Sequence, residues 1–201
     1  MPDVSRCWPL LLCEETLLPG QEFAAHCPDE SWRFFEVTHG VAYWLGQSPP
    51  CDIHPGALVA APPRVNGVVR ASQINEARLR HFCFNPQSVV GLLSLADRAE
   101  ISRRNQPAAL IFPANHSAAQ LVARVPLPES AQTRLASRAG LLHAALLVLA
   151  EHAPVLPGPL EGGASVRRFQ RLSSDASDVS VLSHSTGEIA ELCGCTRRHL
   201  N

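Results

Sequence analysis

Short segments rich in β-branched and aromatic residues recur between residues 32 and 84, separated by turn-forming glycine, proline and asparagine residues. Segments of this composition between turn signals predict β-strands. They cover residues 32–46, predicted to be a β-hairpin that turns at His39-Gly40, then residues 52–61 with a turn at Pro55-Gly56, 65–72, 76–84 and, further on, 109–112. Many short strands at this spacing predict a sandwich or a small barrel.

Helical patterns follow the strands, at residues 116–125 and 129–152. In the longer segment apolar residues recur at spacings of four, three, four and three, which is the seam of a two-helix contact. The seam consists of Leu135, Ala139, Leu142, Leu146 and Leu149. Other leucines make the C-terminal half apolar nearly all round, so this helix is predicted to have two neighbours. One is the barrel and the other is the same helix of a second copy; burial against its own barrel and preceding helix is the alternative.

The bulk composition excludes some classes of protein. The formal net charge is -1, so any affinity for nucleic acid has to be local. No apolar run approaches the ~20 residues that span a membrane, and the N-terminus lacks a signal-peptide pattern. The seven scattered cysteines fit a reducing cytoplasm better than a disulfide framework. We therefore expect a cytoplasmic protein, with Cys193 and Cys195 in a turn and without a metal.

The last sixteen residues, TGEIAELCGCTRRHLN, predict a helix, a turn and the start of a second helix. Thr186 is the predicted N-cap of the first helix, and Gly194 ends it, because glycine adopts the left-handed conformation readily. Thr196 is the next predicted N-cap. A basic first turn would then present side chains to a base edge or phosphate, namely Arg197, Arg198, His199 and Asn201. An ordinary helical hairpin is the alternative.

Two stretches resemble the AraC family of transcriptional regulators. The run IAELCGCTRRHLN is similar to the family pattern ELAxxxGxSxRHLxRxF, and FFEVTHGVAYWLGQSPPCDIHPGALVAAPPRVNGVVR is similar in order to the cupin barrel of its N-terminal domain. The resemblance implies a mixed fold, β and then α. A cupin-like double-stranded β-helix barrel would occupy residues 1–112, a helical dimerisation element 113–152, a linker 153–165 and an incomplete helix-turn-helix DNA-binding domain 166–201.

The resemblance fails at the positions where metal-dependent cupins hold their metal. Glu30 and Trp32 stand where two histidines would be, and Gly67 stands where the third would be. Because a divalent metal needs three or four donors converging on one point, we expect no metal, no cofactor and no enzymatic activity. The alternative is a metal-dependent cupin enzyme whose ligands come from other residues, for instance His26, His39, His54 and His81.

Alternation along residues 32–37 predicts a ligand site. Trp32, Phe34 and Glu36 share one strand face, whereas Arg33, Phe35 and Val37 share the other. If the first set points into the barrel, it supplies an aromatic wall and a carboxylate for a small-molecule effector, together with Arg64 and Arg80. Otherwise the aromatic residues fill the barrel and Glu36 pairs with one of these arginines. The prediction is a ligand-sensing, dimeric regulator that binds DNA; a dimerisation module without a ligand is the further alternative.

Overall fold

The computed structural model describes residues 9–27, 31–46, 49–63, 65–89, 93, 101, 108–151, 168, 172 and 183–196. The chain divides into two compact units. The first comprises residues 1–85 and 106–152, and the second comprises residues 86–105 and 153–201. The predicted boundaries at residues 112, 152 and 165 stay predictions, and the predicted linker lies outside the described residues.

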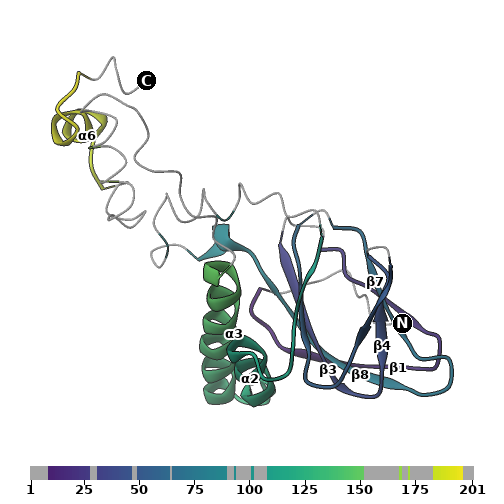
Figure 1. The fold of residues 1–201 in the computed structure, drawn as a ribbon. Helices are drawn as coiled ribbons and strands as arrows, with labels where there is room; N and C mark the ends of the chain where they lie inside the picture. Colours follow the sequence, from purple (N-terminus) through teal and green to yellow (C-terminus); the bar gives the residue numbers. More distant parts are fainter. Residues whose placement is uncertain are drawn as a thin grey trace. The chain divides into compact units, whose positions relative to one another are not determined.

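The first unit contains two antiparallel sheets (Figure 1). The five-stranded sheet has the order β1 (Cys13–Leu17), β8 (Ala77–Phe84), β3 (Trp32–His39), β6 (Leu58–Ala61) and β9 (Leu110–Phe112). The four-stranded sheet has the order β2 (Glu22–Ala24), β7 (Val68–Ala71), β4 (Ala42–Trp44) and β5 (Cys51–Ile53). A 3₁₀ turn, η1 (Pro86–Ser88), follows β8, and helices follow the last strand. The predicted fold class, β and then α, is confirmed.

The predicted hairpin at His39-Gly40 is wrong, although both of its strands form. Strand β3 pairs with β6 and β8, whereas β4 pairs with β5 and β7 in the other sheet. Gly40 has a φ of +77°, and a Cβ there would overlap the carbonyl oxygen of Glu76. The turn therefore passes the chain from one sheet to the other, through a conformation that favours glycine. The Pro55-Gly56 turn does the same between β5 and β6.

A hydrophobic core fills the space between the two sheets. Phe35 and Val37 of β3 point into it, and so do Trp44, Ile53 and Leu79. These side chains are fully buried, and the rings of Phe35 and Trp44 lie 5.7 Å apart. Burial of so many large side chains is the main stabilising contribution to this unit.

Helices cover the other face of the five-stranded sheet. Helix α2 (Ser117–Arg124) contacts β3, and helix α3 (Ala131–Glu151) contacts β8 and α2 (Figure 1). His116 is the N-cap of α2, and its Nδ1 accepts a hydrogen bond from the backbone N–H of Ala118. Its Nε2 therefore carries the proton and donates to the Glu151 carboxylate at 2.7 Å. This bond joins the beginning of α2 to the end of α3.

Helix α3 is long and apolar enough to cross a membrane by length and composition. The expectation that no segment approaches that length is therefore wrong. Core helices of globular domains pass the same test. Helix α3 packs within its unit through one buried face, made of Ser137, Leu141, Ala144, Ala145, Val148 and Leu149.

Candidate functional site

The predicted ligand contacts on β3 lie under the helices and not between the sheets. Trp32, Phe34 and Glu36 are 2%, 0% and 2% exposed. Alternation along β3 is confirmed, but the set that points between the sheets is the one containing Phe35 and Val37. The first set therefore does not point between the sheets, which was the condition for the predicted ligand site. Phe34 instead stacks on Phe82 of β8, with ring centroids 4.7 Å apart and planes 6° from parallel.

Glu36 is a buried carboxyl group opposite Arg80 of the neighbouring strand. Its Oε2 has no hydrogen-bond partner among the described residues. Burial raises the pKa of Glu36 above its ordinary value, and the positive charge of Arg80, opposite it on β8, acts in the other direction. Desolvation is the larger of the two effects. Glu36 is thus more readily protonated than an exposed glutamate.

Arg80 connects the sheet to helix α2. Its guanidinium donates to the carbonyl oxygens of Ala123 at 3.2 Å and Val125 at 2.9 Å. These carbonyls lie at the C-terminal end of α2, where a cation satisfies backbone acceptors and the helix dipole together. The predicted partner Arg64 lies outside the described residues. The roles of Trp32, Phe34, Glu36, Arg64 and Arg80 in ligand binding stay predictions.

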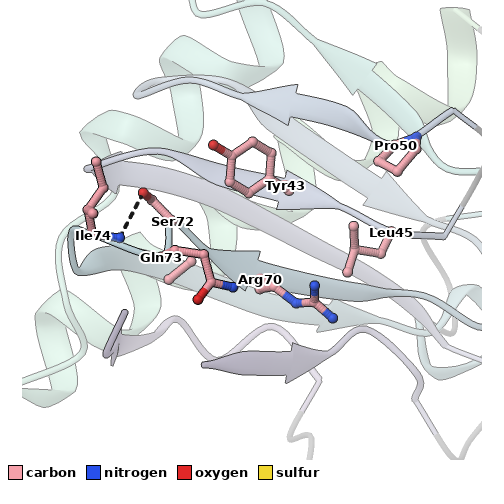
Figure 2. Close-up of a pocket in the computed structure, with 8 residues that line it drawn as sticks. Tyr43, Leu45, Pro50, Arg70, Ser72, Gln73 and Ile74 are labelled. Atoms are coloured by element: carbon pink, nitrogen blue, oxygen red, sulfur yellow. Dashed lines mark hydrogen bonds between the residues drawn. The ribbon is translucent and has the colours of Figure 1, made fainter. Parts of the chain in front are cut away.

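A cavity of about 480 Å³ lies on the face of the four-stranded sheet that points away from the core (Figure 2). It is lined by Tyr43, Leu45, Pro50, Arg70, Ala71, Ser72, Gln73 and Ile74. Tyr43 and Arg70 are cross-strand partners on β4 and β7, and Arg70 donates to the Glu22 carboxylate of β2 at 2.8 Å. The Ser72 hydroxyl accepts from the backbone N–H of Ile74 at 3.3 Å. An aromatic ring, a cation and polar groups around an apolar floor suit a small molecule.

Sequence reasoning missed this cavity. Its residues come from β4 and β7, from the segment between β4 and β5, and from the turn after β7. The alternation of buried and outward residues along 42–44 and 68–71 was the available signal, but it gives no register between the two strands. Without the register, Tyr43 and Arg70 cannot be placed side by side.

The four histidines of the enzyme alternative are not brought together. His26, His39 and His54 are exposed, whereas His81 is buried beside the Phe23 ring at 4.8 Å. Within the described ranges no group of three or more His, Cys, Asp or Glu side chains is placed to hold a metal ion. These four histidines therefore do not form a metal site in the structure.

Helix α6 (Thr186–Leu192) lies where the sequence predicts the first helix of a helix-turn-helix. The predicted N-cap, Thr186, is wrong, because the N-cap of the helix is Ser185. The Ser185 hydroxyl accepts from the N–H of Glu188, and the Glu188 carboxylate accepts from the N–H of Ser185 at 2.6 Å. This reciprocal capping box needs glutamate three residues after the cap, which only Ser185 has. The bond from the Ser185 backbone lowers the pKa of Glu188.

Gly194 ends this segment as predicted, with a φ of +61°. Ala190 and Cys193 are buried on the inner side of the turn, and burial raises the pKa of the Cys193 thiol. A Cβ at Gly194 would overlap the guanidinium of Arg168. Thr196 follows the turn, whereas Arg197, Arg198, His199 and Asn201 lie outside the described residues. Their DNA contacts stay predictions.

The predicted dimerisation seam runs mostly along the outer side of α3. Leu135 is 73% exposed, Ala139 is exposed, and Leu142 and Leu146 are half-buried. Leu149 instead belongs to the buried face. The structure therefore leaves the first four positions of the seam accessible, and their role in dimerisation stays a prediction.

Comparison with protein-family models gives no match, and comparison with curated protein sequences gives none. Among solved structures, ToxT from Vibrio cholerae is similar at 9% identity, with a TM-score of 0.48 over 94% of this chain and 72% of that chain. The AraC-like transcriptional activator CuxR is similar at 15% identity, with a TM-score of 0.41 over 96% and 70%. A cupin protein from Desulfovibrio desulfuricans is similar at 16% identity, with a TM-score of 0.27 over 41% and 92%.

Replacing Glu36 with glutamine should stabilise the protein at neutral pH. A carboxyl group whose folded-state pKa is raised favours folding below its unfolded pKa, near 4.5, and loses that contribution as the pH rises through the folded value. Glutamine does not ionise. Urea unfolding should therefore give the variant a higher free energy of unfolding than the wild type at pH 7, with the difference shrinking towards pH 4.

The control is Glu14→Gln at an exposed position of β1, which should stay within about 0.5 kcal/mol of the wild type at both pH values. A loss of stability in Glu36→Gln at pH 7 would mean that attraction to Arg80 outweighs desolvation.

Proposed function

We propose that this chain is the ligand-sensing and dimerising part of an AraC-type transcriptional regulator, together with the start of its DNA-binding domain. The observation that carries the proposal is the capped helix α6 followed by the left-handed Gly194. A short helix, a small buried residue at Ala190 and a tight turn ahead of a basic segment are features of a helix-turn-helix. The β and helical segments precede it in the order that the resemblance implies.

Arg168 supports the DNA-binding part of the proposal. Its guanidinium lies beside Gly194, so its charge adjoins the turn that leads into the basic segment. Local concentration of positive charge is needed because the chain as a whole has a net charge of -1. The segment after Thr196 would provide the remaining phosphate and base contacts through Arg197, Arg198, His199 and Asn201.

The dimerising part rests on helix α3. Leu135 and the half-buried Leu142 and Leu146 form an apolar stripe on the side of the helix away from its own buried face. Large exposed apolar side chains in a row mark interaction surfaces in soluble proteins. We propose that the stripe packs against the same stripe of a second copy, which the heptad-like spacing allows.

The sensing part rests on the cavity beside Tyr43 and Arg70. Its volume of about 480 Å³ falls in the range of small-molecule sites. A ligand changes the activity of a regulator only if it binds two arrangements of the protein with different affinity. Arg80 supplies a link through which the five-stranded sheet and the helices would move together, because it joins strand β8 to the end of α2.

The filled core between the sheets favours one alternative function, a dimerisation module without a ligand. Phe35, Trp44 and Leu79 fill that space, so a ligand there would have to displace the core. This alternative and the proposal differ in whether any small molecule stabilises the protein. A regulator of either kind acts where the DNA is, in the cytoplasm.

The DNA-binding segment predicts weak, salt-dependent binding to duplex DNA. Fluorescence anisotropy with a labelled duplex should detect binding at low salt, with a steep fall as salt increases. Replacing Arg197 and Arg198 with alanine should reduce the slope of log affinity against log salt by about 2, roughly one for each lost phosphate contact. The control is Arg78→Ala, a half-exposed arginine on β8. An equal loss in the control would place the binding elsewhere.

The stripe on α3 predicts a concentration-dependent dimer. Sedimentation equilibrium should show that Leu135→Glu with Leu142→Glu weakens the dimer by at least about thirty-fold, because two charges would be buried in an apolar contact. Ala136→Glu is the matched control, since Ala136 is exposed and lies about 100° around the helix from Leu135. A wild-type protein that stays monomeric at high concentration would contradict the dimer.

The cavity predicts that some small molecules raise the unfolding temperature. A compound at about a hundred times its dissociation constant stabilises the native state by about 2.7 kcal/mol, a shift of roughly 5–10 °C. The shift should disappear in Tyr43→Ala and persist in Glu36→Gln. The reverse result would place the effector at the helix-covered face of β3. If no compound in a broad metabolite panel stabilises the wild type, the module without a ligand is favoured.

A further inference from the structure

Two cysteines that are far apart in the sequence meet at the end of strand β8. The Sγ atoms of Cys27 and Cys83 lie 2.8 Å apart, although the residues are 56 positions apart in the chain. A disulfide bond is ~2.05 Å long, so the two sulfur atoms need only a small movement towards each other to form one. We propose that Cys27 and Cys83 form a redox-active dithiol that closes to a disulfide when a small peroxide oxidises it.

The surrounding contacts hold the two thiols together. Arg33 of β3 is the cross-strand partner of Cys83. Its guanidinium donates to the carbonyl oxygens of Ala24 at 2.9 Å and His26 at 3.3 Å. These two carbonyls belong to the segment that runs directly into Cys27. The same arginine thus fixes both the strand that carries one thiol and the segment that carries the other.

Burial restricts this pair to a small oxidant. Cys27 is 5% exposed and Cys83 is 2% exposed, which excludes large reagents from both sulfur atoms. Hydrogen peroxide is small enough to reach such a site when the segment after β2 opens locally. In a reducing compartment the pair would stay a dithiol until peroxide appears, which agrees with the composition of the chain.

The reaction balances with peroxide as the two-electron oxidant. The thiolate of one cysteine attacks peroxide, the O–O bond breaks, and the products are a sulfenic acid and water after proton transfer. The second thiol then attacks the sulfenic sulfur, forms the S–S bond and releases a second water. In sum, two thiols and one H₂O₂ give one disulfide and two waters. Low-molecular-weight thiols reverse the reaction by exchange.

Closure of this bond would change how the N-terminal segment is held. The backbone N–H of Leu10 donates to the carbonyl of Cys83 at 2.8 Å, and Pro9 forms a bridge with the same residue. The disulfide would join this docking point to the segment after β2. It would also close a long loop, which restricts the unfolded chain and raises the unfolding temperature.

Peroxide treatment of the whole chain tests the proposal. The protein is exposed to hydrogen peroxide, the remaining thiols are alkylated, and a non-reducing peptide map is recorded by mass spectrometry. We expect an intact mass lower by two hydrogens, a linked peptide containing Cys27 and Cys83, and an unfolding temperature raised by about 5–10 °C that returns to its original value with reductant.

Matched variants keep the result interpretable. Cys27→Ala and Cys83→Ala should each abolish the linked peptide and the temperature shift, whereas Cys195→Ala should retain both. Circular dichroism of the reduced variants checks folding, and either variant of the pair suffices if the other does not fold. The proposal is overturned if Cys27 and Cys83 remain in separate peptides after oxidation, whatever other product forms.

Discussion

Burial of strand β3 on both faces is the constraint on which the rest of the first unit depends. Phe35 and Val37 join the core between the sheets, whereas Phe34 and Glu36 lie under the helices. The strand therefore belongs to two apolar layers at once, and both the second sheet and the helix pair are needed to cover it. A strand buried on both faces reads as a continuous apolar run, and a charge within it is costly. Glu36 is a charged residue of this run, and the cost of its burial is partly offset by the positive charge of Arg80, which also binds the end of α2.

The positions of the strands and helices could be predicted from the sequence, because the signals are local. Gly40, Gly56 and Pro63 bound the strands, and the spacing of Leu135, Leu142 and Leu146 defines a helix without any knowledge of its neighbours. The pairing at His39-Gly40 could not be predicted in the same way. A glycine turn serves a hairpin and a crossing between sheets equally well, and the choice depends on partners such as Glu76 that are distant in the sequence.

For a related reason, the sequence could not predict which side chains of β3 point between the sheets and which point towards the helices. Alternation separates Trp32, Phe34 and Glu36 from Phe35 and Val37, but it does not say which set faces which layer when both sets are largely apolar. The N-cap of α6 was misplaced by one residue, since Ser185 and Thr186 are both good caps and only the Glu188 spacing distinguishes them. Placing Tyr43 beside Arg70 required the cross-strand register, and placing Cys27 beside Cys83 required the path of the segment after β2.

Short edges are a further property of the two sheets, and they restrict how copies of this protein can associate. Among the described strands, β1 and β9 border one sheet and β2 and β5 the other, and each is three to five residues long. Exposed backbone donors and acceptors on such brief edges offer little template for another chain. Strand addition between molecules is thereby disfavoured, so a second copy of this chain would have to bind through side-chain surfaces such as the outer stripe of α3.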